Sequence, residues 1–181
     1  MIEWPRVPLG DIAKITTGGT PSRSNSSYWN GDIHWLTPRD LPLPGEGIAT
    51  IEDTNDRITR KGLNSCAATI LPEGTVTFTS HSSIGKIGIT RIPLATNQGF
   101  NNLTPKEGVN AMYLAFALRY FTDEIERSTP NSSYGSVSKS AISKFKIPLP
   151  PPSEQHRIVN ILDRALALRR KRARANTLSN R

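Results

Sequence analysis

The sequence predicts an α+β domain followed by a long helix at the carboxyl end. Short runs rich in β-branched residues alternate with turn clusters, without a steady βαβ rhythm. One strongly periodic helical segment lies inside the body, near residues 110–127. A second helical pattern starts at Ser153 and continues almost to the last residue. We therefore divide the chain into a globular part, residues 1–152, and a helix, residues 153–181.

The first elements follow from local composition. Residues 7–15 carry short apolar runs, which fit a strand or a short helix. Residues 16–32 are dense in Gly, Ser, Thr and Asn, which predicts a long loop. The apolar run 33–37 is a predicted strand that Pro38 ends.

The later elements of the globular part follow from the same signals. Between 110 and 127, apolar residues recur three and four positions apart, so one face of this helix belongs to the core. The other predicted elements are a short helix after Ile58, a turn at 72–74, strands at 75–79 and 84–92, and a short helix and strand within 139–150.

The final helix follows a stack of prolines in "KIPLPPP", residues 146–152. Proline lacks an N–H and restricts the residue before it, so the helix cannot extend backwards, and Ser153 is the expected N-cap. About 25 helical residues would extend about 38 Å, more than a small body covers. Its heptad-like apolar stripe therefore predicts pairing with another helix, as in a coiled coil, through Ile158, Ile161, Leu162, Ala165 and Leu168.

Charge is concentrated in that helix. Of a net charge of +8, residues 153–181 contribute eight Lys/Arg against two acids, whereas residues 1–152 hold fifteen against thirteen. A basic segment attracts phosphate or an acidic partner. No apolar run approaches the ~18 residues of a membrane span, and the amino terminus lacks the pattern of a signal peptide. We expect a cytoplasmic protein.

No catalytic constellation is recognisable. The chain has no phosphate-binding glycine loop, nucleophile elbow or H-E-x-x-H pair. Ser83 and Lys86 match S-x-x-K, but the segment reads as loop into strand and its companion motifs are missing. The single cysteine, Cys66, and three scattered histidines offer no disulfide and no metal-ligand spacing. We expect neither enzymatic activity nor a bound cofactor or metal.

Polar loops take the place of catalytic motifs. "GTPSRSNSSYW", "TSHSSIGK", "TNQGFNN" and "NSSYGSVSKS" combine hydroxyls, amides, basic groups and aromatic rings. These groups hydrogen-bond phosphate oxygens and base edges. In any one loop they can equally be ordinary turn formers. Four such loops in a body without catalytic residues favour a surface that reads DNA.

Four segments together resemble the specificity subunits of Type I restriction–modification systems. They are "LGDIAKITTGGTPSRSNSSYWNGDIHWLTPRDL", "LPEGTVTFTSHSSIGKIGI", "LATNQGFNNLTP" and "KIPLPPPSEQHRIVNIL", in the order of the family. The resemblance covers residues 7 to about 168. It implies a target recognition domain that reads one half of a split DNA sequence, followed by a spacer helix.

The resemblance also implies partners. In the family, methylation subunits carry the S-adenosylmethionine chemistry, and restriction subunits use ATP and Mg²⁺ for translocation and cleavage. The specificity subunit is itself non-catalytic. Base-reading residues cannot be carried over from the family, because recognition domains differ most there. From the polar loops we select as candidates Arg23, Ser24, Asn25, Arg39, His81, Ser82, Lys86, Asn131, Ser132, Ser133, Tyr134 and Lys139.

This chain departs from the family by holding one recognition domain and one helix, whereas the usual subunit repeats the pair. It is either a half-length subunit that forms a homodimer or a fragment. An antiparallel pair would place the arginines of 169–174 near Glu154 of the other chain. A protein-interaction module that uses the helix without reading DNA is the main alternative, and an enzyme fragment is the third.

Overall fold

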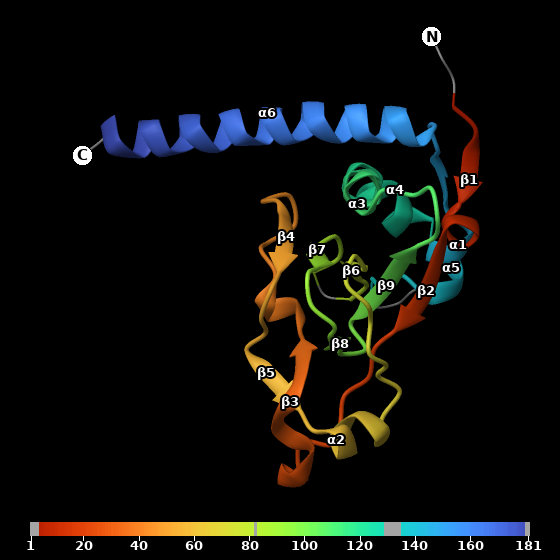
Figure 1. Cartoon of the computed structure of the whole chain (residues 1–181), viewed down its shortest axis with the longest axis vertical. Coiled ribbons are helices and arrows are strands. Elements are labelled where there is room, and N and C mark those ends of the chain that lie inside the picture. Colours follow the sequence, from red (N-terminus) through yellow and green to blue (C-terminus); the bar gives the residue numbers. More distant parts are fainter. Residues whose placement is uncertain (1–3, 82, 129–134, 180–181) are drawn as a thin grey trace.

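The computed structural model describes residues 4–81, 83–128 and 135–179, with side chains of the last helix described to residue 168 and at Arg172. Figure 1 shows a body of three small sheets and several short helices. The helix α6 (Pro152–Ser179) lies across one end of this body and continues well beyond it. The predicted class, a mixed α+β body with a long final helix, is confirmed.

A five-stranded sheet forms the centre of the body. Its strand order is β2 (Ala13–Thr17), β9 (Phe100–Pro105), β6 (Val76–Thr79), β7 (Ile87–Thr90) and β4 (Ile48–Ile51). All pairs are antiparallel except β4 with β7. Every residue of β6 and β7 is buried, as expected of central strands covered on both faces.

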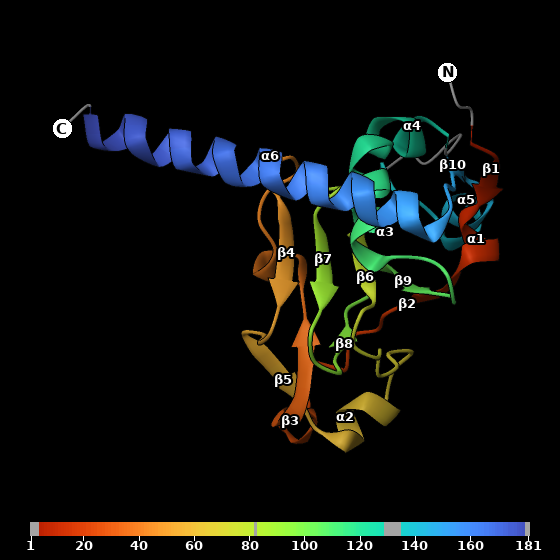
Figure 2. The same cartoon turned by 45° about the horizontal axis from the view of Figure 1, so that its top comes forward.

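A three-stranded sheet builds the far end of the body, away from α6 (Figure 2). Strand β3 (Trp29–Leu36) lies between β5 (Asp56–Ile58) and the short β8 (Ala95–Thr96). The predicted strand at 33–37 is therefore present and begins earlier. Consequently the predicted loop is shorter than expected, since it starts after β2 and contains the 3-10 helix η1 (Ser26–Tyr28).

Helix α3 (Ala111–Tyr120) packs on the central sheet, and its buried face joins the main core as the periodicity predicts. Asn110 caps it, because its side-chain oxygen accepts a hydrogen bond from the Tyr113 N–H at 3.0 Å. The predicted single helix is divided, however. The backbone at Phe121 leaves helical geometry (φ −94°, ψ 10°), and α4 (Thr122–Arg127) follows.

The first and last strands of the body form one ladder. β1 (Arg6–Pro8) pairs antiparallel with β10 (Lys146–Pro148), and Val7 faces Ile147. The short helices α1 (Leu9–Ile12) and α5 (Lys139–Lys144) follow β1 and precede β10. The remaining helical pieces are η2 (Pro38–Asp40) and α2 (Arg60–Asn64).

The start of α6 differs from the expectation by one residue. The helix begins at Pro152, so Ser153 is not its N-cap. A proline at the first helical position loses nothing, because that N–H has no partner inside a helix. The Pro151 carbonyl instead accepts hydrogen bonds from the N–H groups of Glu154 at 2.9 Å and Gln155 at 3.0 Å. The proline stack thus leads directly into the helix.

Tyr113 connects α3 to that stack. Its replacement by phenylalanine should show the pH range in which this contact stabilises the fold. Its hydroxyl donates to the Pro148 carbonyl at 2.7 Å, and burial raises the pKa of Tyr113 to about 12. At neutral pH the substitution should cost about 1–3 kcal/mol, since it leaves a carbonyl without its donor. The unfolded tyrosine ionises near pH 10, so this stabilisation is complete below pH 10 and declines towards pH 12.

Urea unfolding of both proteins from pH 7 to 12 measures this difference. The gap in free energy of unfolding between the parent and Tyr113→Phe should narrow as the pH rises from about 10 to 12. A gap that stays constant over this range would contradict a buried, hydrogen-bonded phenol.

Candidate nucleic-acid interface

Three of the polar loops meet at one edge of the body. The Gly19 N–H donates to Thr96 O at 2.9 Å, and the Ser80 N–H donates to Gly99 O at 2.8 Å. The Thr20 hydroxyl also donates to Oε1 of Gln98. The described part of the fourth loop, from residue 135 on, joins them through the Val137 N–H, which donates to Ser80 O at 2.9 Å. Segments far apart in sequence therefore share one surface.

Two of these loops, "TSHSSIGK" and "TNQGFNN", line a hollow of about 400 Å³ together with Pro38, and we call it the loop hollow. It presents an imidazole, a hydroxyl and two amides, the groups that hydrogen-bond base edges. Asn97 keeps its place because its Oδ1 accepts from the Gly99 N–H at 2.9 Å. Its lining residues are Pro38, His81, Ser83, Asn97, Gln98 and Gly99.

Among the residues that line the hollow, His81 alone was one of our candidates, and the two amides were missed. Asn97 and Gln98 lie in "TNQGFNN", a polar loop that also carries the resemblance to the family, and we selected no candidate from it. The structure shows that such a segment holds its backbone in the fold and still turns polar side chains outward. Gln98 is exposed, and Asn97 is half-buried at the rim. A motif match alone does not separate these two roles.

Arg23, Ser24 and Asn25 lie at the far end of the body. Arg23 stacks on Trp29, with its guanidinium carbon 3.6 Å from the ring centroid, and pairs with Asp56 at 2.8 Å. It remains exposed, so one face of the guanidinium is open to a ligand. Asn25 instead caps η1 by accepting from the Ser27 N–H at 3.1 Å, and the Ser24 hydroxyl lies 2.8 Å from that of Ser22.

Arg39 and Lys139 are exposed at the surface. Arg39 sits in η2, which Asp40 fixes by accepting from the N–H of Thr37 at 2.7 Å. Lys139 is the first residue of α5, next to the capping residue Ser138. Among the described residues neither side chain has a hydrogen-bonding partner. The other candidates of these loops, Ser82 and Asn131 to Tyr134, lie outside the described residues.

Lys86 does not fit the role that we predicted for it. Its side chain is only 9% exposed, and its ammonium donates to the carbonyls of Pro38 at 2.8 Å and Leu41 at 3.3 Å. A buried lysine is retained when its donors are used inside the protein. Lys86 therefore braces the segment that carries Arg39, and we remove it from the candidates for base contact.

The change Lys86→Met tests this correction. The stem of methionine fills similar space, but two buried carbonyls lose their donor, which should cost about 1–3 kcal/mol of unfolding free energy. Chemical denaturation measures the cost, and the exposed Lys139→Met is the matched control, with a change within about 0.5 kcal/mol. A stable Lys86→Met protein with altered preference at one base pair would restore the original prediction.

His81 remains a candidate. It lines the loop hollow and is exposed, and its Nδ1 lies 3.0 Å from the Ser80 hydroxyl. Another imidazole is engaged inside the fold: His34 on β3 lies 3.1 Å from Asp53. Asp53 also pairs with Arg57, and the hydrogen bond from the Thr54 N–H is the main cause that lowers the pKa of the Asp53 carboxyl.

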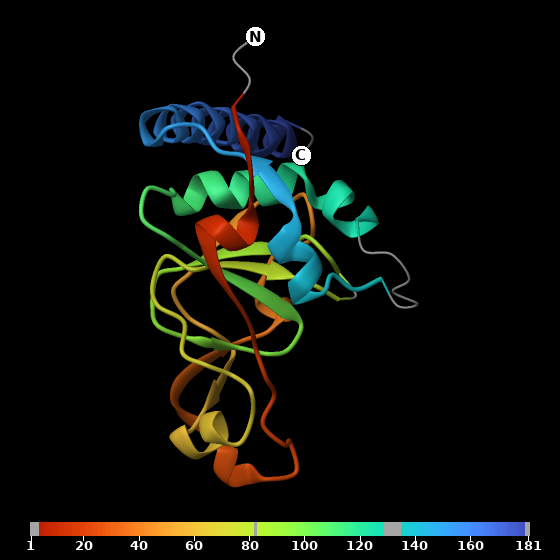
Figure 3. The same cartoon turned by 90° about the vertical axis from the view of Figure 1, so that its right-hand side faces the viewer.

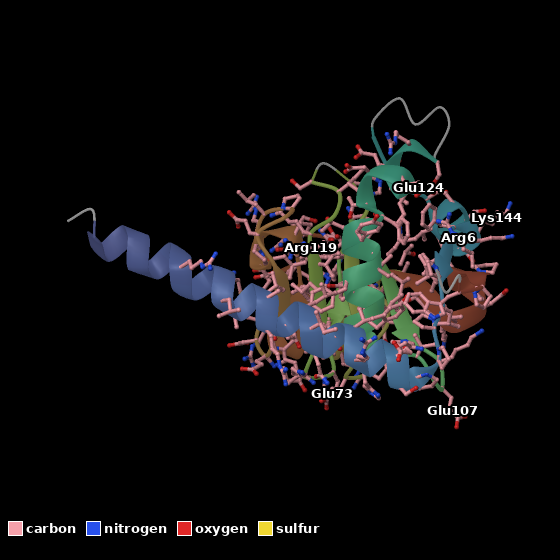
Figure 4. The ribbon with its side chains drawn as sticks, turned by 90° about the horizontal axis from the view of Figure 1, so that it is seen from above. Arg6, Glu73, Glu107, Arg119, Glu124 and Lys144 are labelled. Carbon is pink, nitrogen blue, oxygen red and sulfur yellow. The ribbon has the colours of Figure 1, made fainter. Side chains whose placement is uncertain are left out.

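A basic groove of about 440 Å³ lies beside α5. Figure 4 shows Arg6, Glu124 and Lys144 together at this corner of the body. Arg6 is 3.6 Å from Glu124, whereas Lys144 and Lys146 are exposed without a salt-bridge partner among the described residues. The sequence could not reveal this groove, because β1 brings Arg6 alongside residues about 140 positions later.

Figure 3 shows how these features are arranged. The helices α4 and α5 and the 20–28 segment at the far end project towards the same side of the body. The loop hollow and the basic groove are linked along this side, because residue 137 is bonded to Ser80 and leads directly into α5. We call this side the reading face.

The apolar stripe of α6 is divided between two directions. Ile158 and Leu166 pack against the main core, and Val159 belongs to it. Leu162 and Ala165 line a groove of about 390 Å³ with Phe116, Arg119 and Tyr120 of α3. Ile161 and Leu168 point away from the body and are 55% and 62% exposed. Of the five residues predicted for helix pairing, Ile158 is partly buried against the body, and Ile161 and Leu168 are the large apolar side chains most exposed on α6.

Within residues 4–81, 83–128 and 135–179, no three His, Cys, Asp or Glu residues are grouped so that they could hold a metal ion. No helix in these ranges is both long enough and apolar enough to cross a membrane.

The family model of the Type I restriction modification DNA specificity domain matches residues 1–177. The MjaIX specificity subunit of a Type I restriction enzyme from Methanocaldococcus jannaschii is 35% identical over 162 residues, 88% of this chain and 37% of that protein. The EcoR124I/EcoR124II specificity subunit from Escherichia coli is 29% identical over 170 residues, 90% and 40% of the two chains.

Solved structures share the fold. A chain from a study of assembly and conformational transition in the type I R-M system superposes with a TM-score of 0.74 at 23% identity, over 99% of this chain and 43% of that one. The HsdS subunit from Thermoanaerobacter tengcongensis gives 0.67 at 23% identity, over 94% and 40%. The chain thus spans about two fifths of the length of the curated relatives it matches.

Proposed function

Because the chain belongs to the family of Type I restriction modification DNA specificity domains, we propose that it reads one half of a bipartite DNA target and docks methylation subunits onto that DNA. As a member of this family it is a specificity component and not a catalytic one, as the sequence predicted. The observation that best supports DNA reading is the loop hollow, which two polar loops line and which a third reaches through the hydrogen bond from Thr20 to Gln98.

The two parts of the reading face suit different parts of a duplex. The amides of Asn97 and Gln98 and the guanidinium of Arg39 have the donor and acceptor pattern that distinguishes base edges. An ammonium group is a compact point charge and lacks the planar, bidentate geometry that reads a base edge, so it suits phosphate contacts. Such groups are exposed on Lys139, Lys144 and Lys146. We therefore assign sequence readout to the hollow and backbone contact to the basic groove.

The proposed division predicts two kinds of mutational effect. Gln98→Ala should cost about 1–3 kcal/mol for the preferred target and relax specificity at one base pair. Lys144→Ala with Lys146→Ala should weaken all duplexes alike and reduce the slope of log affinity against log salt by up to about 2. Fluorescence anisotropy with a panel of duplexes measures both, in the presence of the methylation subunits.

Arg91→Ala is the matched charge control, because Arg91 is exposed and follows β7 at the end away from the 80–86 turn. It should leave both the specificity and the salt slope unchanged.

The isolated chain should bind weakly, since residues 1–152 are nearly neutral. A chain that binds no DNA, alone or with methylation subunits, yet associates through α6, would favour the protein-interaction module instead.

We further propose that S-adenosylmethionine, ATP and Mg²⁺ act on the methylation and restriction subunits and that the complex works in the cytoplasm. We also propose that a second copy of this chain reads the second half-target. Two copies that pair antiparallel through α6 place their reading domains at opposite ends. The target of such a homodimer is a split palindrome.

A further inference from the structure

Gln155 is a buried polar residue in the first turn of a largely exposed helix. Its side chain is 1% exposed, whereas its neighbours Ser153, His156 and Arg157 are exposed. Burial of an amide is unfavourable unless its hydrogen-bonding groups are satisfied. The position of this side chain is therefore set by the partners that it finds inside the protein.

Gln155 uses both ends of its amide. Oε1 accepts from the Asn110 N–H at 2.8 Å, while Nε2 donates to Gly108 O at 3.1 Å and to Pro150 O at 3.0 Å. Both N–H donors thus have partners. All three partners are backbone groups, which cannot rotate away as side chains can. One residue of α6 is consequently bonded to the turn before α3 and to the proline stack.

The last backbone donor of the proline stack is the Leu149 N–H, which donates to Pro5 O at 2.9 Å. Residues 150–152 are prolines without an N–H to donate, so this end of the stack is held through its carbonyls. Pro148 O receives the Tyr113 hydroxyl at 2.7 Å, and Pro150 O receives Nε2 of Gln155. Gln155 therefore holds both sides of the junction, the segment that enters the helix and the body on which the helix lies.

The other described contacts between α6 and the body are mainly apolar. Val159, Ile158 and Leu166 pack on the core margin. Apolar contacts are non-directional and tolerate sliding and rotation, whereas hydrogen bonds to fixed backbone groups do not. The 28 residues of α6 extend about 42 Å, so a tilt of about 10° at the first turn moves the far end by about 7 Å. That displacement equals the rise of about two base pairs.

We propose that Gln155 is a positioning residue that sets the direction of α6 relative to the reading face. If the chain reads DNA as a two-fold pair, as proposed above, Gln155 thereby also sets the separation of the two half-sites. It would touch neither DNA nor the second chain.

A distance measurement on the chain itself tests the first part. Spin labels are placed at Glu73, an exposed turn residue of the body, and at exposed Arg172 of α6, in a Cys66→Ser background. Mixed with an excess of unlabelled chain, so that only distances within one chain are detected, the parent should give one narrow distance distribution by double electron–electron resonance. Gln155→Leu should broaden or shift it. The adjacent Glu154→Gln removes only the ion pair with Arg157 and should leave it unchanged.

Gln155→Asn provides a milder variant that keeps the amide but is one methylene too short to reach all three partners. Circular dichroism identifies which variants are folded. A folded Gln155→Leu or Gln155→Asn protein with the narrow distribution of the parent would overturn the proposal. This outcome does not depend on DNA, so it is separate from any failure of the proposed function.

Methylation of split palindromes, with spacers that differ by single base pairs, tests the second part. A misplacement of about 1 Å can cost about 100-fold in rate, so the parent complex should favour one spacer by about that factor. Gln155→Asn should reduce this preference to about 10-fold or less, with half-site preference unchanged. An unchanged spacer preference, or equal loss of both preferences, would overturn this part. No methylation by the parent would count against the proposed function alone.

Discussion

Replacing Trp35 with alanine is expected to lower the free energy of unfolding by about 3–5 kcal/mol. Trp35 is 2% exposed in the far-end core. Its indole N–H donates to Gly19 O at 3.0 Å, and its ring meets that of Trp29 edge-on at a centroid distance of 5.1 Å. The substitution therefore removes a large apolar group and also releases the loop that begins at Gly19.

This change should reach the reading face as well. Gly19 leads into Thr20, whose hydroxyl donates to Gln98 in the loop hollow. Chemical denaturation measures the stability, and amide hydrogen exchange should show reduced protection in residues 18–28. Leu43→Ala is a suitable control, since Leu43 is 58% exposed and its loss should stay within about 0.5 kcal/mol. A loss below about 1 kcal/mol for Trp35→Ala would contradict the packing described here.

Ile161→Asp combined with Leu168→Asp is expected to convert a homodimer into a monomer. Each buried side chain of this size contributes about 1.5–3 kcal/mol, and a two-fold pair would lose four of them. Because about 4 kcal/mol corresponds to 1000-fold in affinity, the dissociation constant of the dimer should rise by more than about 1000-fold. Light scattering or analytical ultracentrifugation at micromolar concentration measures the change.

The choice of residues matters for this test. Ile158 packs against the body's own core, and Leu162 lines the groove with α3, so aspartate at either position would also loosen the helix from its domain. The exposed Asp163→Asn serves as the matched control on the same helix. A parent chain that is already monomeric at tens of micromolar would contradict the dimer and favour a fragment that requires its second half.

Sequence patterns predicted those elements that depend only on residues within one short segment. The apolar face of α3 and the strand that contains Trp35 follow from periodicity within a few residues. Strand β9 did not, because "FNNLTP" places Asn101 and Asn102 where strands usually carry apolar residues. Both asparagines are buried and donate through their side chains, to Val137 O and to the Thr96 hydroxyl. Such partners are set only by the assembled fold.

The candidate site shows the same limit. His81 and Arg39, which we selected by residue type, are exposed, whereas Lys86, selected in the same way, is buried and its ammonium donates to two carbonyls. The basic groove needs Arg6 beside Lys146, a proximity that exists only after β1 and β10 pair. Charge and hydroxyl content identify which residues could bind DNA. The topology decides which of them share a surface.

The ladder between β1 and β10 also constrains how the protein is made. Arg6 pairs with Pro148, so β1 cannot form its ladder until β10, near the end of the body, has been synthesised. Closing so long a loop carries a large entropic cost before any contact repays it, and chains dominated by distant pairings fold slowly. We therefore expect synthesis of α6 to begin before the body on which it packs has finished folding. During that interval the apolar side of the new helix is available to whichever chain is nearest, including a sister chain on the same messenger.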